Sequence, residues 1–319
     1  MKTTLRQAGT PIGLFLILLF FTMQLPETFL TPRNLLNVSQ QISMLAVVAF
    51  SMTVVMVMND FDLSVGSMAS LSGIVAATMF AAGFPVWAGI AAALAVGLFG
   101  GVLNGILVSL IGILPFVATL GTLTIFSGLA FYVSDGRTIF GRDIPGEFSG
   151  LSRSGIPLDS FGLEGLKLPS LTIAAFAVLA VIWLTLEQTN YGRRLYAIGG
   201  NVEAARLAGI RVHALRLSAF AVTGLGAAFA GLMYASRVAS ANPTQGAGLM
   251  LDAIAAVFLG MTMGKEGEPR VLATLVGVLI LGILDNGLTQ MKVDSYIREM
   301  LIGATVIAAV AISSFRRKN

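Results

Sequence analysis

The stretch VWAGIAAALAVGLFGGVLNGILVSL, residues 86–110, runs for 25 positions without a charged side chain. A transmembrane helix needs about 20 mostly apolar residues, because each residue advances about 1.5 Å and the hydrocarbon core of a bilayer is about 30 Å thick. This stretch is therefore predicted to be a membrane-spanning helix, and it indicates the class of the whole chain.

Similar apolar runs recur along the chain, bounded by Gly, Pro or charged residues. They lie at roughly 11–30, 40–58, 65–83, 114–133, 169–187, 215–236, 249–263, 270–290 and 296–314. The composition agrees, because 56% of the 319 residues are hydrophobic and only 11% are charged, against about a quarter in soluble domains. We predict an all-α polytopic membrane protein with about ten transmembrane helices and a single domain over residues 1–319.

The distribution of basic residues predicts the orientation of these spans. An even number of spans places both termini on one side, and short cytoplasmic loops carry an excess of Lys and Arg. With a cytoplasmic N-terminus, 12 of the 20 basic residues are cytoplasmic, and four of the other eight lie in the segment 134–168. We therefore predict cytoplasmic termini, an external loop at 134–168 and a cytoplasmic loop at 188–214, whose arginines face lipid headgroups or an acidic partner rather than nucleic acid.

Residue types that carry enzyme chemistry are scarce. There is no Cys and only one His, His213, which argues against disulfides, thiol catalysis and Cys- or His-based metal sites. The Gly264-Lys265 pair lacks the other residues of a phosphate-binding loop. We expect no catalytic residue, no metal site and no cofactor held by this chain.

The cytoplasmic stretch GRRLYAIGGNVEAARLAGI, residues 192–210, predicts a short capped helix at 202–208. Asn201 is a favourable N-cap, Glu203 suits the positive end of the helix dipole, and Gly209 can adopt the left-handed conformation that ends a helix. Ala204 and Ala205 leave a surface that a partner can approach closely. The stretch is interpreted as a docking helix for a cytoplasmic motor, and the alternative is a capped connector without a partner.

Four stretches resemble the ribose-type ABC sugar permeases, and they occur along the chain in the same order as in that family. They are the Gly-Arg-x-x-x-Ala-x-Gly-x-Asn-x-x-Ala-Ala-x-x-x-Gly-Ile pattern of 192–210, DLSVGS at 62–67, Asn104-Gly105 followed by PFVATLG at 115–121, and LDAIAAV at 251–257. The sequence departs from the family pattern at three places: Asn59-Asp60-Phe61 stands where the family usually has Gly-Gly-Ile, the expected turn at residues 264–269 is charged, and Ser127 stands in place of an Arg.

The resemblance implies a bundle of the type II ABC importer class in a bacterial inner membrane. It also implies a second permease subunit, cytoplasmic ATPase subunits that hold the ATP and Mg, and a periplasmic or extracellular sugar-binding protein. The residues assigned on this basis to ATPase coupling are Asn201, Glu203, Ala204, Ala205, Arg206 and Gly209. The expected function is import of a monosaccharide or related polyol.

Polar residues inside or beside the apolar runs are candidates for a substrate path, because ionisable groups in a membrane usually face the bundle interior or a water-filled cavity. They are Asp62, Ser64, Asn104, Asp252, Asp285 and Asn286, with Asp60 beside them. Each has a structural alternative. Asp62 or Ser64 can cap the third span, Asp252 suits the first turn of the eighth, and Asn104 lies on a GxxxG surface suited to interhelical hydrogen bonding. For Asp285 and Asn286 pathway and packing roles are equally compatible with the sequence.

Two other functions are compatible with this composition. An ion-coupled secondary transporter would use the intramembrane acids to carry protons or sodium, and it would need no motor interface. A membrane scaffold or receptor would leave those acids without a purpose.

Overall fold

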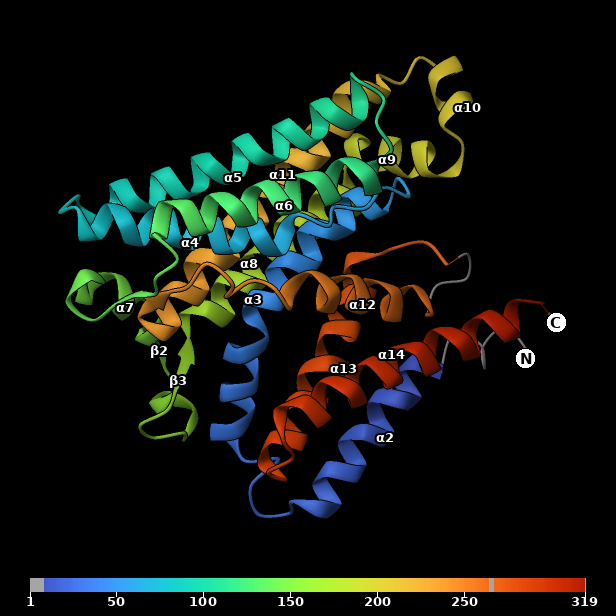
Figure 1. The fold of residues 1–319 in the computed structure, drawn as a ribbon. Coiled ribbons are helices and arrows are strands. Elements are labelled where there is room, and N and C mark those ends of the chain that lie inside the picture. The colour runs from blue at the N-terminus through green and yellow to red at the C-terminus, as the bar shows by residue number, and fades with distance from the viewer. Residues whose placement is uncertain (1–8, 264–266, 319) are drawn as a thin grey trace.

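The computed structural model describes residues 9–263 and 267–318, and within them the chain is mostly helical (Figure 1). The α-helices are α2 (Gly9–Gln24), α3 (Pro32–Met56), α4 (Val65–Ala81), α5 (Val86–Ser109), α6 (Pro115–Ser134), α7 (Gly146–Arg153), α8 (Ser170–Trp183), α9 (Asn190–Gly200), α10 (Val202–Leu207), α11 (Val212–Val238), α12 (Leu249–Met261), α13 (Val271–Gln290) and α14 (Ser295–Lys318). The strands are β1 (Ile139–Phe140), β2 (Gly155–Pro157), β3 (Lys167–Pro169) and β4 (Ser240–Ala241). The prediction of an all-α polytopic chain is confirmed at this level.

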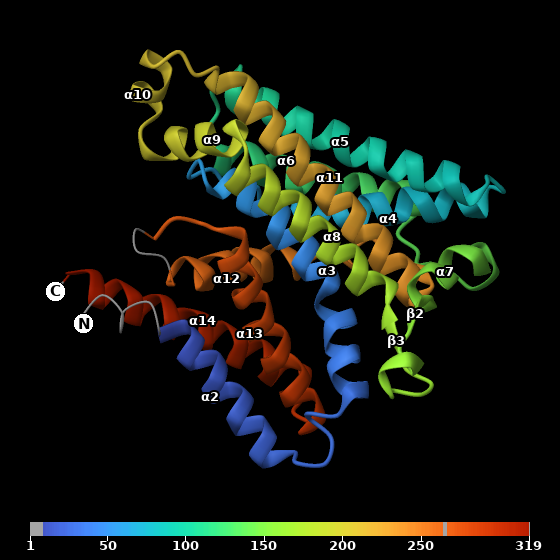
Figure 2. The same cartoon turned by 180° about the vertical axis from the view of Figure 1, so that it is seen from behind.

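Helix α3 lies at the centre of the bundle. It packs against α8 and α11 on one side and against α12 and α13 on the other, and α4, α5 and α6 complete the first group (Figures 1 and 2). Its inner half, from Ser43 to Met56, is almost wholly buried. An apolar helix buried on all sides belongs at the centre of a bundle.

The bundle has two distinct ends. One carries α9 and α10 and is called the α10 end; the other carries α7 and the antiparallel hairpin β2–β3 and is called the α7 end (Figure 1). Strand β1 pairs with β4, through Ile139 with Ala241 and Phe140 with Ser240. The segment 134–168 therefore consists of short elements.

Six of the described helices are long and apolar enough to cross a membrane: α3, α5, α6, α11, α13 and the continuous run Ser170–Gln188. The last combines α8 with the π turn η3 (Leu184–Gln188). Helices α2, α4 and α12 are apolar but shorter. The predicted spans overlap these helices closely from the third onward.

The prediction that the second span begins near residue 40 is wrong. Helix α3 begins at Pro32, after Thr31, whose Oγ1 accepts a hydrogen bond from the Asn34 amide. Its first turns carry polar side chains, so a prediction from hydropathy alone assigns them to a loop. They are accommodated because Asn34 and Gln41 donate to Asn286 and Asp285 of α13.

Glycines let α5 and α11 approach closely, as the GxxxG pattern at 101–105 predicts. A Cβ on Gly101 would lie 2.3 Å from the Phe220 carbonyl oxygen, and one on Gly105 would lie 2.8 Å from Cα of Leu217. No side chain fits in that space, so the glycines set the distance between the two helices.

Candidate coupling site and buried polar network

The polar stretch 190–207 forms two helices at the α10 end. Thr189 accepts hydrogen bonds from the amides of Tyr191 and Gly192 and so caps α9, a helix that the sequence analysis did not predict. The sequence does contain a signal for the start of α9, because Thr189 is a residue type that commonly caps the N-terminus of a helix. Burial raises the pKa of Tyr196, on α9, above its ordinary value, and the neighbouring Glu187 charge raises it further.

Helix α10 is short and capped at both ends. Asn201 Oδ1 accepts a 2.9 Å hydrogen bond from the Ala204 amide, and Gly209 has a φ of +80°. The predicted N-cap and the predicted left-handed glycine are therefore confirmed. The helix ends at Leu207, one residue earlier than predicted, because Ala208 already has a ψ near zero.

The exposed face of α10 differs from the expected one. Glu203, Ala204 and Arg206 are exposed, with Arg206 Nη1 3.5 Å from Glu203 Oε1. Ala205, which the sequence analysis grouped with the contact residues, is only 4% exposed and packs in the core. Leu207, which the sequence analysis missed, is 87% exposed. The exposed surface of α10 is therefore mixed, with one large apolar side chain.

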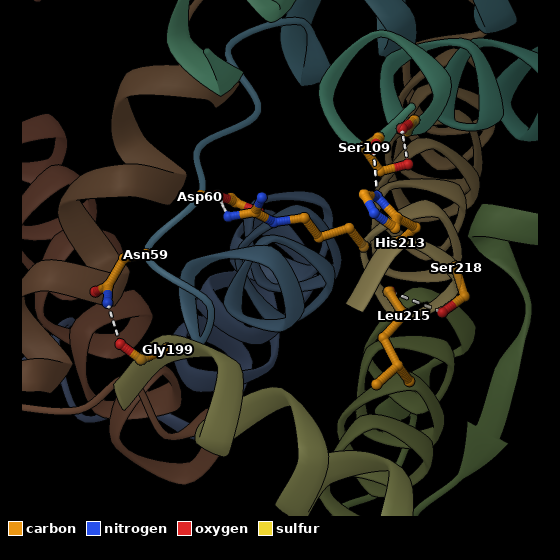
Figure 3. Close-up of polar contacts among 9 residues, drawn as sticks. Asn59, Asp60, Ser109, Gly199, His213, Leu215 and Ser218 are labelled. Carbon is orange, nitrogen blue, oxygen red and sulfur yellow. Dashed lines mark hydrogen bonds and ion pairs between the residues drawn. The ribbon is translucent and has the colours of Figure 1, made fainter. Parts of the chain in front are cut away.

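The linker 57–64 joins α3 to α4 and passes directly beside the end of α9. Asn59 donates a 2.7 Å hydrogen bond to the carbonyl of Gly199, at the end of α9 (Figure 3). Asp60 forms an ion pair with Arg216 of α11, with Nε 2.9 Å from Oδ2 and Nη2 donating to Oδ1 at 3.1 Å. Burial raises the pKa of Asp60 to about 6, against the opposing effect of the Arg216 charge. No partner for Asp60 could be predicted from the sequence.

Three of the predicted substrate-path residues come together in one buried network. Asp62 Oδ1 accepts from the amide of Ser64 at 2.9 Å and from its hydroxyl at 2.6 Å. Asn104 Nδ2 donates to Ser64 Oγ at 2.8 Å, and Thr122 Oγ1 donates to Asn104 Oδ1 at 2.7 Å. The network joins α4, α5 and α6, so the interhelical hydrogen bonding expected of Asn104 is confirmed.

The capping role expected of Asp62 or Ser64 takes a different form. Ser64 is the N-cap residue of α4, but its side chain accepts no hydrogen bond from the helix amides. Asp62 closes the turn before the helix instead. Asp62, Ser64 and Asn104 are each at most 2% exposed, so the network is closed to solvent in this conformation.

The other predicted path residues lie elsewhere in the bundle. Asp285 accepts from Gln41 at 2.7 Å and pairs with Arg298 of α14 at 2.7 Å. Asn286 Oδ1 accepts from Asn34 at 3.1 Å. Both therefore join α13 to its neighbours, and the structure does not bring them together with Asp62.

Asp252 lies in the first turn of α12, as expected. Residues 9–263 and 267–318 contain no group of three or more His, Asp or Glu side chains arranged to hold a metal ion.

A pocket of about 330 Å³ opens at the α7 end. Three cationic side chains line it: Arg33, Arg153 of α7 and Lys167 of β3. The side-chain amides of Asn37 and Gln40 also line it.

Comparison with known proteins gives a consistent result. Residues 34–310 match the family described as "Branched-chain amino acid transport system / permease component". The chain is 37% identical to the ribose import permease protein RbsC of Bacillus subtilis over 316 residues, covering 99% of this chain and 94% of the relative. Two Escherichia coli K12 proteins are each 32% identical: the D-allose transport system permease protein AlsC, covering 95% of this chain and 90% of the relative, and the galactose/methyl galactoside import permease protein MglC, covering 98% and 96%.

No solved structure gives a significant match to the chain. The family match covers most of the sequence, and the relatives are similar over nearly their whole length. The chain therefore belongs to the family of branched-chain amino acid transport system permease components, and it is a multi-pass membrane permease of an ABC importer.

Proposed function

We propose that this permease imports a monosaccharide or a related polyol, driven by ATP hydrolysis on a partner subunit. The observation that carries the proposal is that relatives named for ribose, allose and galactose are all at least 32% identical over nearly the whole chain. The family description names amino acids, but three sugar permeases at this similarity favour a sugar. The chain itself is a transport subunit and not an enzyme.

The topology that fits this function has ten spans with both termini in the cytoplasm. The α10 end is then cytoplasmic and the α7 end external. In that frame α2, α4, α12 and α14 cross together with the six candidate spans. Helices α2, α4 and α12 are short, and short helices can cross when the bilayer thins locally. The localisation is the bacterial inner membrane, with a second permease subunit completing the transport path.

The cytoplasmic ATPase, which holds ATP and Mg, docks on α10. Its contact is the exposed face formed by Glu203, Ala204, Arg206 and Leu207. Asn201 and Gly209 shape the helix from its two ends, and buried Ala205 anchors it to the bundle. ATP-driven closure of two ATPases then moves α10 and shifts the permease between outward and inward states.

The external pocket is the proposed contact for the sugar-binding protein. Arg33, Arg153 and Lys167 surround it, and such a cluster attracts acidic groups and speeds association. Binding there would bring the sugar to the outer end of the bundle.

Asp252, Asp285 and Asn286 are the better candidates for contact with sugar on its way through. Asp285 keeps 29% of its side chain exposed, and carboxylate and amide groups can replace the hydrogen bonds that sugar hydroxyls lose on leaving water. Asp62, Ser64 and Asn104 are buried, so they reach substrate only if their helices separate.

Reconstitution into liposomes tests this function. The permease is combined with the ATPase and binding protein encoded beside it, and uptake of labelled ribose, allose and galactose is measured, with leucine as the control. Uptake of a sugar that requires internal ATP and persists after ion gradients are collapsed is expected. Gradient-driven uptake by the permease alone would show a secondary transporter instead.

A further inference from the structure

The linker 57–64 is held on both sides by contacts to other parts of the chain. On one side, Asn59 bonds to the Gly199 carbonyl at the end of α9. Gly199 packs directly against the linker backbone, because a Cβ there would lie 2.0 Å from the Val57 carbonyl oxygen. The backbones of the linker and of the end of α9 therefore meet with no side chain between them at Gly199.

The ion pair of Asp60 with Arg216 makes a second contact on the same side. Arg216 lies one turn into α11, which begins at Val212 shortly after α10 ends, and the Asp60 side chain is only 4% exposed. His213, in the first turn of α11, contacts the Ser109 carbonyl at the end of α5. Breaking one side of a buried ion pair is costly, so the pair keeps the linker and the start of α11 together.

On its other side the same linker enters the buried polar network. Asp62 and Ser64 are its last polar residues, and Asn104 donates to Ser64 at 2.8 Å. Thr119 of α6 also donates to the Phe61 carbonyl, at 3.4 Å. Within eight residues the chain thus contacts α9 and α11 near α10, and then α5 and α6 in the core.

Asn59 and Asp60, which contact Gly199 and Arg216, differ from the permease motif that residues 59–67 resemble. That motif has glycines at the positions of Asn59 and Asp60, and glycine has no side chain to donate to Gly199 or to pair with Arg216. Asn59 adopts a φ of 60°, a conformation in which glycine is also at ease. Both residues can therefore be replaced by glycine without backbone strain.

We propose that the linker 57–64, clamped by Asn59 to Gly199 and by Asp60 to Arg216, transmits the movement of α10 to the Asp62–Ser64–Asn104 network. Asp60 and Arg216 are then positioning residues, since they touch neither sugar nor nucleotide. The inference builds on the proposed ATPase docking at α10.

The main test uses the complete importer in liposomes and compares three variants with the wild type. They are the double substitution Asn59→Gly/Asp60→Gly, Arg216→Ala, and all three changes together. Sugar transported per ATP is expected to fall by about fivefold or more in each, the usual lower range of coupling between sites. The KM for the sugar-loaded binding protein and the basal ATPase rate should stay unchanged, and the triple variant should be no worse than either parent.

A control and a second measurement make the outcomes separable. Asp159→Gly, at the exposed β2–β3 hairpin, should leave transport per ATP unchanged. In the wild-type complex, amide exchange of residues 57–64 should also change when the ATPase binds ATP, which requires no variant. Unchanged coupling in the assembled variants, or unchanged exchange in the wild type, would overturn the inference, whereas failure of the proposed function would appear as no ATP-dependent uptake by the wild type.

Discussion

The side-chain amide of Asn104 donates a 2.8 Å hydrogen bond to Ser64 Oγ and accepts one from Thr122, so a single residue of α5 joins α4 to α6. All three side chains are at most 2% exposed. In a bundle whose helices are otherwise mostly apolar, such a bond fixes which helix faces meet.

Thr122→Ala should lower the stability of the bundle by about 1–2 kcal/mol, because it leaves the buried Asn104 carbonyl without its Thr122 donor. Thr124→Ala is the matched control on the same helix, since that hydroxyl is exposed and donates only to its own helix at Leu120. Thermal unfolding in detergent checks both. Equal shifts in melting temperature would contradict the role given to the network.

Gly101→Ala should destabilise the α5–α11 contact by about 1–3 kcal/mol, because the new methyl group would overlap the Phe220 carbonyl oxygen. Gly121→Ala, on α6, meets no atom within 4 Å and should be neutral or slightly stabilising. The yield of folded protein and its melting temperature separate the two. A stable Gly101→Ala protein would show that the helices can move apart at little cost.

Leu207→Ser should weaken binding of the ATPase by about tenfold, since exposed apolar anchors carry much of the affinity of an interface. The chain itself should fold normally, because this side chain is 87% exposed. Leu151→Ser, exposed on α7, is the control. If the ATPase copurifies equally with both variants, the docking surface does not include Leu207.

Arg153→Glu should slow docking of the sugar-binding protein by about threefold or more, because reversing a charge at the rim of a contact acts mainly on the association rate. Arg142→Glu, which does not line the pocket, provides the comparison. Association rates measured at two salt concentrations test the idea. Equal rates for wild type and Arg153→Glu at low salt would exclude the pocket from the contact.

The Asp60–Arg216 pair should make coupling sensitive to pH. The folded pKa of Asp60 is raised from 3.8 to about 6, so the carboxyl gains a proton as the pH falls through about 6 and the ion pair weakens. Transport per ATP should therefore fall in the wild type over that range but stay level in Asp60→Asn. Stability changes in the opposite sense: because the folded state binds this proton more tightly, the contribution of the carboxyl to stability is full below pH 3.8 and is lost as the pH rises through about 6.

Local signals predicted the short capped helix α10 correctly in outline. Asn201 and Gly209 act within one turn of the backbone, so their caps followed from residue type alone. The face that α10 exposes could not be predicted in this way, because burial of Ala205 depends on where the rest of the bundle lies. The same limit applied to α3, whose polar first turns are stabilised by partners on α13.

By itself the sequence determined that the chain is a helical membrane protein, roughly where most of its spans lie, and that a short capped helix interrupts them. These are properties of hydrophobic length and of local backbone preference. Only the tertiary structure decided that Asp60 meets Arg216, 156 positions away, and that Asp62, Ser64 and Asn104 form one network while Asp285 and Asn286 lie apart from it. Partners of buried polar groups are set by helix packing, and the energy of leaving such a group unpaired depends on neighbours that no local stretch of sequence contains.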